Sequence, residues 1–340
     1  MTSAASPRRV AVPELLRQPP ARPLHGRVRA LSGITMGTSW SVKFVGSDAT
    51  AATLQRTIPS ALDRVVAQMS PWESDADISR FNRLPPGEWQ QLPPETVRVM
   101  QCALQIAGES SGAYDPTLGA LVDLWGFGPR GGRSAPPAAA EVTSLHHPDG
   151  WRRLELDAVA RRLRRQGPTG PIDLCGIAKG FAVDLVMEAL HEQGVHHALV
   201  EIGGELLGRG IKPDGNPWWV ELDRPAGSRP AEAPLLVALH DLAIATSGRE
   251  RSFASGGRHY SHTLNPRTGY PIANGMVTAT VLHGSCMAAD AYATALMVLG
   301  PEAGLAFATR HELAALILFE DEDGAVLREQ TTPQLDAMLA

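Results

Sequence analysis

Four apolar runs in the second half of the chain decide its fold class: HALVEI at residues 197–202, PWWVELD at 217–223, PLLVALH at 234–240 and MVTATVLH at 276–283. Each run is short and rich in Val, Leu or Trp, which is typical of a β-strand. The runs follow one another and do not alternate with helices. The sequence therefore favours an α+β fold with mixed or antiparallel sheets over a doubly wound βαβ fold.

Apolar residues at helical spacing precede these strands. Leu54, Ile58, Leu62, Val65 and Met69 recur every three or four positions and predict an amphipathic helix over residues 51–69. The other predicted elements are a strand at 33–46, a helix entered through Pro93-Pro94, a hairpin from 152–157 and 161–166, helices over 178–192 and 286–299, one further helix, and strands at 314–319 and 325–330.

The chain shows no internal repeat and no linker, so we expect one compact domain over residues 29–330. A flexible arm over residues 1–28 is expected before it and a tail over 331–340 after it. Residues 129–150 are rich in Gly, Pro and Ala and predict an exposed loop.

Composition and charge exclude several classes of protein. The 340 residues are 44% hydrophobic and 20% charged, which is ordinary for a globular protein. The net charge of −5 argues against a nucleic-acid partner, because such a protein needs a basic face. The longest unbroken apolar run, residues 313–319, is far shorter than the roughly 20 residues of a membrane helix, so no membrane span is expected.

The N-terminal residues and the cysteines predict a cytoplasmic location. The first 26 residues carry Arg and Pro where a signal peptide needs an apolar core, and no lipid-anchor cysteine follows them. Cys102, Cys175 and Cys286 are widely separated and form neither a disulfide framework nor a CxxC metal motif. A reducing compartment is the default for such a chain.

Two Gly-rich segments in the first half carry polar or aromatic side chains. Met36-Gly37-Thr38 lies inside the predicted first strand and is either a β-bulge or a place where a ligand approaches the backbone. Asp115-Pro116 can begin a helix, with Asp115 as N-cap. The nearby aromatic residues Tyr114, Trp125 and Phe127 are instead suited to stacking against a planar ring.

A third segment, IDLCGIAKG at residues 172–180, predicts a strand, a Gly turn and the start of a helix. Backbone N–H groups at a helix start attract anions, and Lys179 adds a compact positive charge. Lys179 is one of only three lysines among 31 basic residues. The alternative interpretation is that Lys179 is simply a solvated helix residue. The next segment, EIGGE at 201–205, is a strand running into a double Gly, which could be a tight turn with no ligand at all.

The densest polar segment is SHTLNPRTGYP at residues 261–271. His262 has the most functional surroundings of the 11 histidines and is a candidate base, although a single histidine is commonly structural or solvated.

Asp290 and Thr294 lie four positions apart on a predicted helix of small residues, so their oxygens share one face. A carboxylate and a hydroxyl on one face suit a hard cation such as Mg²⁺. The alternative is that both residues serve only their own helix and bind no cation. Asp is favourable near a helix N-terminus, and the Thr hydroxyl can hydrogen-bond back to its own helix.

Together these segments resemble the ApbE-type FAD:protein FMN transferases, which are bacterial flavin transferases. The resemblance extends over roughly residues 33–300 in the family's order and rests on ITMGTSWSV, MSPWESDADISRFN, GAYDPTLGALVDLWGFG, IDLCGIAKGFAVD, VEIGGEL, SGRERSF, SHTLNPRTGYPI and VTATVLHGSCMAADAYATALMVLG. It implies a single compact α+β unit with a flavin-nucleotide cleft.

The resemblance also implies site residues. Asp290 and Thr294 match the family's Mg²⁺ ligands, and the third ligand, a backbone carbonyl, falls on Gly176. His262 matches the family's histidine and implies a catalytic base, with Asp290 also catalytic. The implied FAD contacts are Met36, Trp72, Ala113, Tyr114, Asp115, Asp173, Lys179 and Leu264.

Trp72 stands where the family commonly has a tyrosine, Asn265 replaces its usual Asp, and Cys175 replaces a small residue. The uncharged Asn265 cannot act as a base.

The implied reaction moves FMN from FAD to a Thr or Ser hydroxyl of an acceptor flavoprotein and releases AMP, with Mg²⁺ as cofactor and FAD as substrate. The expected partners are FAD and another protein as acceptor, because the chain's own Ser111-Gly112-Ala113-Tyr114 ends in Tyr where the family's acceptor motif has Thr or Ser. Two alternatives stay open: a Mg²⁺-dependent FAD pyrophosphatase that gives FMN and AMP, and a non-catalytic flavin-binding protein.

Overall fold

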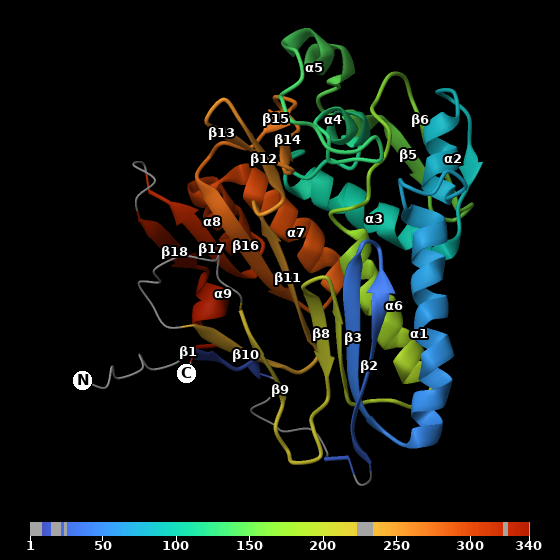
Figure 1. Cartoon of the computed structure of the whole chain (residues 1–340), viewed down its shortest axis with the longest axis vertical. Coiled ribbons are helices and arrows are strands. Elements are labelled where there is room, and N and C mark those ends of the chain that lie inside the picture. Colours follow the sequence, from blue (N-terminus) through green and yellow to red (C-terminus); the bar gives the residue numbers. More distant parts are fainter. Residues whose placement is uncertain (1–8, 15–21, 24–25, 223–233, 322–325, 340) are drawn as a thin grey trace.

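The central feature of the fold is an eight-stranded sheet (Figure 1). The computed structural model describes residues 9–14, 22–23, 26–222, 234–321 and 326–339. The strand order is β18-β17-β16-β11-β8-β7-β3-β2, and every neighbouring pair is antiparallel. The strands are β2 (Arg27–Thr35), β3 (Thr38–Gly46), β7 (Ala198–Ile202), β8 (Glu205–Arg209), β11 (Leu242–Gly248), β16 (Met276–His283), β17 (Ala314–Glu320) and β18 (Leu327–Thr331).

Helices cover one face of this sheet. The long α1 (Asp48–Met69), α3 (Pro94–Glu109), α6 (Ala178–Glu192), α7 (Cys286–Leu299) and α8 (Pro301–Arg310) pack there around the main hydrophobic core. Side chains alternate along each strand, so Val42 and Phe44 of β3 enter this core while Val45 points to the other face.

The other face is covered by a small sheet and a C-terminal helix. The sheet has the order β1-β10-β9, formed by β1 (Arg9–Ala11), β10 (Leu235–Leu239) and β9 (Trp218–Glu221), and α9 (Pro333–Asp336) lies beside it. The apolar residues of the small sheet and of α9 join Val45, Ile244 and Leu318 of the large sheet in a second core. The central strands of the large sheet are therefore covered on both faces.

Shorter elements lie at one end of the large sheet (Figure 1). They are α2 (Asp77–Arg83), α4 (Gly119–Leu124), α5 (Ala139–Leu145), the sheet β4-β6-β5 with β4 (Gln90–Gln91), β5 (Leu154–Asp157) and β6 (Arg162–Arg165), and the hairpins β12 (Ser252–Ser255) with β13 (Arg258–Ser261) and β14 (Leu264–Asn265) with β15 (Tyr270–Pro271). A third apolar cluster, which includes Trp125, Phe127, Val142 and Leu264, holds this end together.

The predicted α+β class is confirmed, and the predicted helices over 178–192 and 286–299 have the bounds of α6 and α7. The prediction of one strand over 33–46 was wrong. Met36 and Gly37 form the tight turn between β2 and β3, with left-handed φ values of 46° and 72°. Residues 129–150 are not wholly loop, since they contain α5 with its buried Val142.

The expected arm and tail were wrong where the structure describes them. Residues 9–11 form β1, which pairs in parallel with β10. Strand β2 already begins at Arg27, and the tail contains α9, whose Leu335 is fully buried. The rest of the predicted arm lies largely outside the described residues. Within the described part of the chain, no helix has the length and apolar character needed to cross a membrane.

Candidate active site

The carboxylate of Asp290 lies between two helices. Asp290 on α7 is only 4% exposed, and its Oδ2 accepts a hydrogen bond of 3.0 Å from the backbone N–H of Gly180 in the first turn of α6. Glycine is needed here, because a Cβ at position 180 would collide with the Cys286 carbonyl oxygen and lie 2.9 Å from the Asp290 Cβ. The close helix contact therefore directs the Asp290 side chain at the start of α6.

Thr294 follows one turn later on α7. Its Oγ1 lies 3.2 Å from Oγ of Ser247 on β11, and a Cβ built on Gly176 would lie 3.0 Å from the same oxygen. Gly176 precedes α6, so the start of one helix abuts the side chain of the other. The structure thus brings Asp290, Thr294 and Gly176 to one place.

The donor set at this place fits a hard cation. Among the described residues, the Gly180 N–H is the one hydrogen-bond partner of the Asp290 carboxylate. Burial raises the pKa of Asp290, because a carboxylate with so little compensation resists ionisation, and the Lys179 charge opposes this shift. A cation would supply the missing compensation, and carboxylate, hydroxyl and carbonyl oxygens suit Mg²⁺. Within the described residues, no three His, Cys, Asp or Glu side chains cluster as a metal site, so a cation here would depend mainly on neutral oxygens.

Lys179 is held by a carboxylate that the sequence analysis assigned to no site. Its Nζ forms an ion pair with Oε1 of Glu205, which is 1% exposed at the start of β8. Burial lowers the pKa of Lys179, but the charges of Asp290 and Glu205 outweigh it and the net pKa is raised. Lys179 therefore remains a cation. Its side chain is 31% exposed and so still reaches solvent.

Tyr114 and Asp115 lie in a buried loop before α4. The Tyr114 hydroxyl is buried and has no hydrogen-bond partner in the described structure. Asp115 Oδ1 accepts from the N–H (2.8 Å) and the hydroxyl (2.6 Å) of Thr117, while its buried Oδ2 has no partner among the described residues. Asp115 is not a helix N-cap, because α4 begins at Gly119 after Leu118. Ala113 beside them is also buried.

Asp173 connects this loop to the start of α6. Its backbone N–H donates to the carbonyl of Pro116 at 2.8 Å, and its Oδ1 accepts from the N–H of Cys175 at 2.7 Å. The same carboxylate is one of the charges that raise the pKa of Tyr114, after burial, Asp290 and Cys102. Asp173 therefore lies near both Tyr114 and the Asp290 site.

His262 has a defined tautomer. Its Nδ1 lies 3.1 Å from the carbonyl oxygen of Arg251. A carbonyl can only accept, so Nδ1 carries the proton and Nε2 is left as the proton acceptor. Burial lowers the pKa of His262, and the charges of Arg251 and Lys179 lower it further. His262 is therefore neutral near pH 7, as a general base must be.

The segment after His262 is a short hairpin with Asn265 as its turn residue. The Asn265 side-chain oxygen accepts from the N–H of Arg267 at 2.9 Å, and its carbonyl accepts from Gly269 at 2.8 Å. An amide oxygen performs this turn role without charge. Leu264, which pairs with Pro271, is buried in the third apolar cluster. Trp125 and Phe127 belong to the same cluster, where Trp125 stacks on Tyr260 and Phe127 contacts Phe253, and their stacking on a ligand ring stays a prediction.

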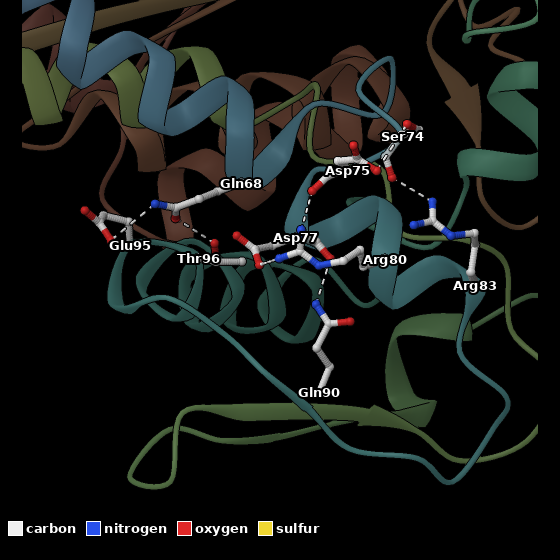
Figure 2. Close-up of polar contacts among 9 residues, drawn as sticks. All are labelled: Gln68, Ser74, Asp75, Asp77, Arg80, Arg83, Gln90, Glu95 and Thr96. Atoms are coloured by element: carbon white, nitrogen blue, oxygen red, sulfur yellow. Dashed lines mark hydrogen bonds and ion pairs between the residues drawn. The ribbon is translucent and has the colours of Figure 1, made fainter.

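The loop that carries Trp72 is held by α2. Arg83 donates to the carbonyl of Ser74 at 2.7 Å, and Arg80 contacts both the carbonyl of Asp75 and the carboxylate of Asp77 (Figure 2). Ser74, Arg83 and Asp173 line a pocket of about 230 Å³ that also includes Pro71, the residue before Trp72. Trp72 itself is 49% exposed.

Met36 lies at the β2–β3 turn, which contacts the β7–β8 turn. The Gly203 N–H donates to the carbonyl of Ser39 at 3.1 Å, and a Cβ on Gly203 would lie 2.8 Å from the Thr38 methyl group. This contact relates Met36 to the hairpin that presents Glu205, but within the described structure no hydrogen bond or ion pair joins Met36 or Trp72 to Asp290.

Three residues of this region had no predicted role. Glu205 and Ser247 lay in quoted motifs but received no role, and Arg251 supplies the carbonyl that fixes His262. The double Gly before Glu205 was the available signal, because it predicted a tight turn that would place the next residue.

Solved structures of flavin transferases share this fold. The flavinyl transferase ApbE of Pseudomonas stutzeri superposes with a TM-score of 0.84 at 36% identity, covering 93% of this chain and 98% of that one. The flavin transferase ApbE of Vibrio cholerae gives a TM-score of 0.84 at 35% identity, with 92% and 100% covered. Among curated proteins, the FAD:protein FMN transferases of Vibrio cholerae and Haemophilus influenzae are 37% and 32% identical, and in each case 90% of this chain and 90% of the relative are covered. The model of the ApbE family matches residues 36–317. The chain belongs to the ApbE family.

Proposed function

We propose that this chain is an FAD:protein FMN transferase that moves FMN from FAD to a Thr or Ser hydroxyl of an acceptor flavoprotein. The observation that carries this proposal is the meeting of Asp290, Thr294 and Gly176 beside Lys179, in a chain 37% identical to a protein of that name. Phosphoryl transfer depends on charge neutralisation and positioning more than on covalent chemistry, and these residues supply both.

The reaction needs one bond made and one broken. The acceptor hydroxyl oxygen bonds to the phosphorus of the FMN portion, the phosphorus–oxygen bond to AMP breaks, and AMP leaves with the bonding electrons. His262 takes the hydroxyl proton on Nε2, the nitrogen left free by the bond between Nδ1 and the Arg251 carbonyl. The product is a phosphoester between FMN and the acceptor side chain.

Asp290, Thr294 and the Gly176 carbonyl would hold Mg²⁺, which when bound neutralises charge on the diphosphate. Lys179 adds a fixed positive charge beside the same groups. The other proposed FAD contacts follow the family resemblance. They are Met36, Trp72, Ala113, Tyr114, Asp115, Asp173 and Leu264. The unpaired hydroxyl of Tyr114 and the unpaired Oδ2 of Asp115 support two of them, since a ligand could satisfy both atoms.

The test is incubation of the protein with FAD, Mg²⁺ and a candidate acceptor, followed by mass spectrometry of the acceptor. We expect a mass gain of one FMN and equimolar AMP. Release of FMN and AMP without acceptor at a comparable rate would favour the pyrophosphatase. Tightly bound but unchanged FAD would favour a flavin-binding protein.

A further inference from the structure

Glu205 is the buried charge that the proposed chemistry leaves without a role. Its carboxylate is 1% exposed, one oxygen pairs with Lys179, and the other, Oε2, has no partner among the described residues. Burial raises the pKa of Glu205, and the charge of Asp290 raises it further, so a carboxylate at this position is costly. An unfavourable group in a site region calls for a functional explanation.

The backbone of Glu205 is fixed by the turn before it. Gly203 and Gly204 adopt left-handed φ values of 61° and 101°, and Glu205 pairs with Ile202 as the first residue pair of the β7–β8 hairpin. The turn is packed against Thr38, which leaves no room for a Cβ at Gly203. The carboxylate is therefore presented to α6 from a rigid element.

The side chain of Lys179, unlike the rigidly held Glu205, is flexible. A lysine side chain has four rotatable bonds, and its ammonium ion is a flexible point charge. The ion pair with Glu205 restricts that freedom and commits one of the three N–H groups, which leaves the others to meet an anion.

We infer that Glu205 is a positioning residue that fixes the Lys179 ammonium group for the FAD diphosphate. This inference rests on the proposed function, because it takes FAD as the ligand. The direction in which FAD affinity changes when Glu205 is removed distinguishes this positioning role from a purely electrostatic one. An ionised Glu205, taken as a charge alone, repels the diphosphate anion. A positioning role predicts that removing Glu205 weakens FAD binding, and a purely electrostatic role predicts that it strengthens binding.

The experiment measures FAD affinity by flavin fluorescence with the full chain and Mg²⁺, without acceptor. We expect Glu205→Ala to raise the Kd for FAD about tenfold, which is the scale of one charge-assisted hydrogen bond. Glu205→Gln keeps an acceptor oxygen of similar size and should lose less. Lys179→Ala should weaken binding at least as much as Glu205→Ala. The double variant Lys179→Ala/Glu205→Ala should be no weaker than Lys179→Ala alone, because both act through one ammonium group.

Glu201→Gln is the matched control. Glu201 lies on the same hairpin, where it accepts hydrogen bonds from the Gly204 N–H at 3.1 Å and from the Ser41 hydroxyl at 3.2 Å. The Glu201→Gln variant should bind FAD with wild-type affinity. Tighter or unchanged FAD binding by both Glu205 variants would overturn the inference. Effects of Glu205→Ala and Lys179→Ala that multiply would overturn it as well. If Glu205→Ala fails to fold, Glu205→Gln in the Lys179→Ala background decides the same question. A wild-type chain that binds FAD but does not modify acceptors would refute the transfer reaction and leave this inference standing.

Discussion

Asp290 combines burial with a proposed role in cation binding, and the two have opposite consequences for stability. Burial raises its pKa in the folded chain above the value of about 3.9 in the unfolded chain. The unfolded state then releases this proton first as the pH rises. The free energy of unfolding therefore falls from about pH 3.9 upward through the folded-state pKa.

Asp290→Asn should separate these effects. Without divalent cation, the variant should melt at a higher temperature than the wild type at pH 7, because it removes a buried charge of similar shape. Addition of Mg²⁺ should raise the melting temperature of the wild type only, and transfer activity should be lost in the variant. Differential scanning calorimetry with and without Mg²⁺ checks this, and an equal Mg²⁺ response in both proteins would remove Asp290 from the metal site.

His262 sets the expected pH dependence of the reaction. Its lowered pKa places the acidic limb of kcat/KM below pH 6.5, with activity rising as the pH rises and the histidine loses its proton. His262→Gln should lower the transfer rate about a hundredfold or more and leave FAD affinity unchanged. The exposed His259 on neighbouring β13 provides the control, and His259→Gln should retain both the rate and the pH profile. An unaltered acidic limb in His262→Gln would assign the proton transfer to another group.

Sequence alone could single out Asp290, Thr294 and Lys179, because their types and spacing carry chemical meaning. It could not single out Glu205 as the partner of Lys179. The two lie 26 positions apart, and their contact depends on how the β7–β8 turn meets α6. The neutral tautomer of His262 was equally hidden, since it depends on the Arg251 carbonyl 11 positions away.

At the scale of elements, the packing of α6 against α7 is the arrangement that builds the site. Asp184 of α6 anchors the N-terminus of α7 by accepting from the Ser285 hydroxyl at 2.7 Å and from the N–H groups of Cys286 and Met287 at 2.9 and 3.0 Å. Gly180 then allows the close approach that brings Asp290 to the start of α6. The relative position of these two helices fixes where the Asp290 carboxylate lies.

Gly180→Ala should disrupt this helix pair. The added methyl group would meet the Cys286 carbonyl, so we expect a loss of about 1–3 kcal/mol in the free energy of unfolding and weaker Mg²⁺ binding. The control is Gly108→Ala in α3, where the nearest atoms to the new Cβ lie 3.8 Å away and the better helix propensity of Ala should stabilise by up to about 1 kcal/mol. Urea unfolding of both variants measures the difference. Equal stability of the two variants would contradict the close-packing argument.

Elements were predictable where the apolar pattern ends at a clear breaker. Helix α6 stops before Gly194, and β16 stops before Gly284, so both had correct bounds. The β2–β3 hairpin was missed because its turn contains only Met36 and Gly37, and the alternating pattern runs through it. Helix α5 was missed because its Ala- and Pro-rich surroundings are typical of a loop.

At the scale of the whole molecule, the central strands of the large sheet are covered on both faces, and the candidate site lies on the helix-covered side. The helix-covered face holds α6 and α7, while the other face is closed by β1, β9, β10 and α9. The four apolar runs of the second half predicted strands but not which sheet each would join, and β9 and β10, which lie within two of these runs, in fact belong to the small sheet. Long-range pairing such as that of β1 with β10 leaves no local pattern in the sequence, which is why both chain ends were expected to be loose.

This division predicts that the closing layer contributes to stability without shaping the site. Leu335 of α9 is fully buried in the second core, so Leu335→Ala should lower the free energy of unfolding by about 2–5 kcal/mol. Met338→Ala, two residues beyond α9 at a partly buried position of the same core, should cost less. The folded fraction of both variants should bind FAD with wild-type affinity, because α9 lies across the sheet from Asp290 and Lys179. Chemical unfolding and FAD titration check the two parts, and a large loss of FAD affinity in folded Leu335→Ala would show that the layers are coupled.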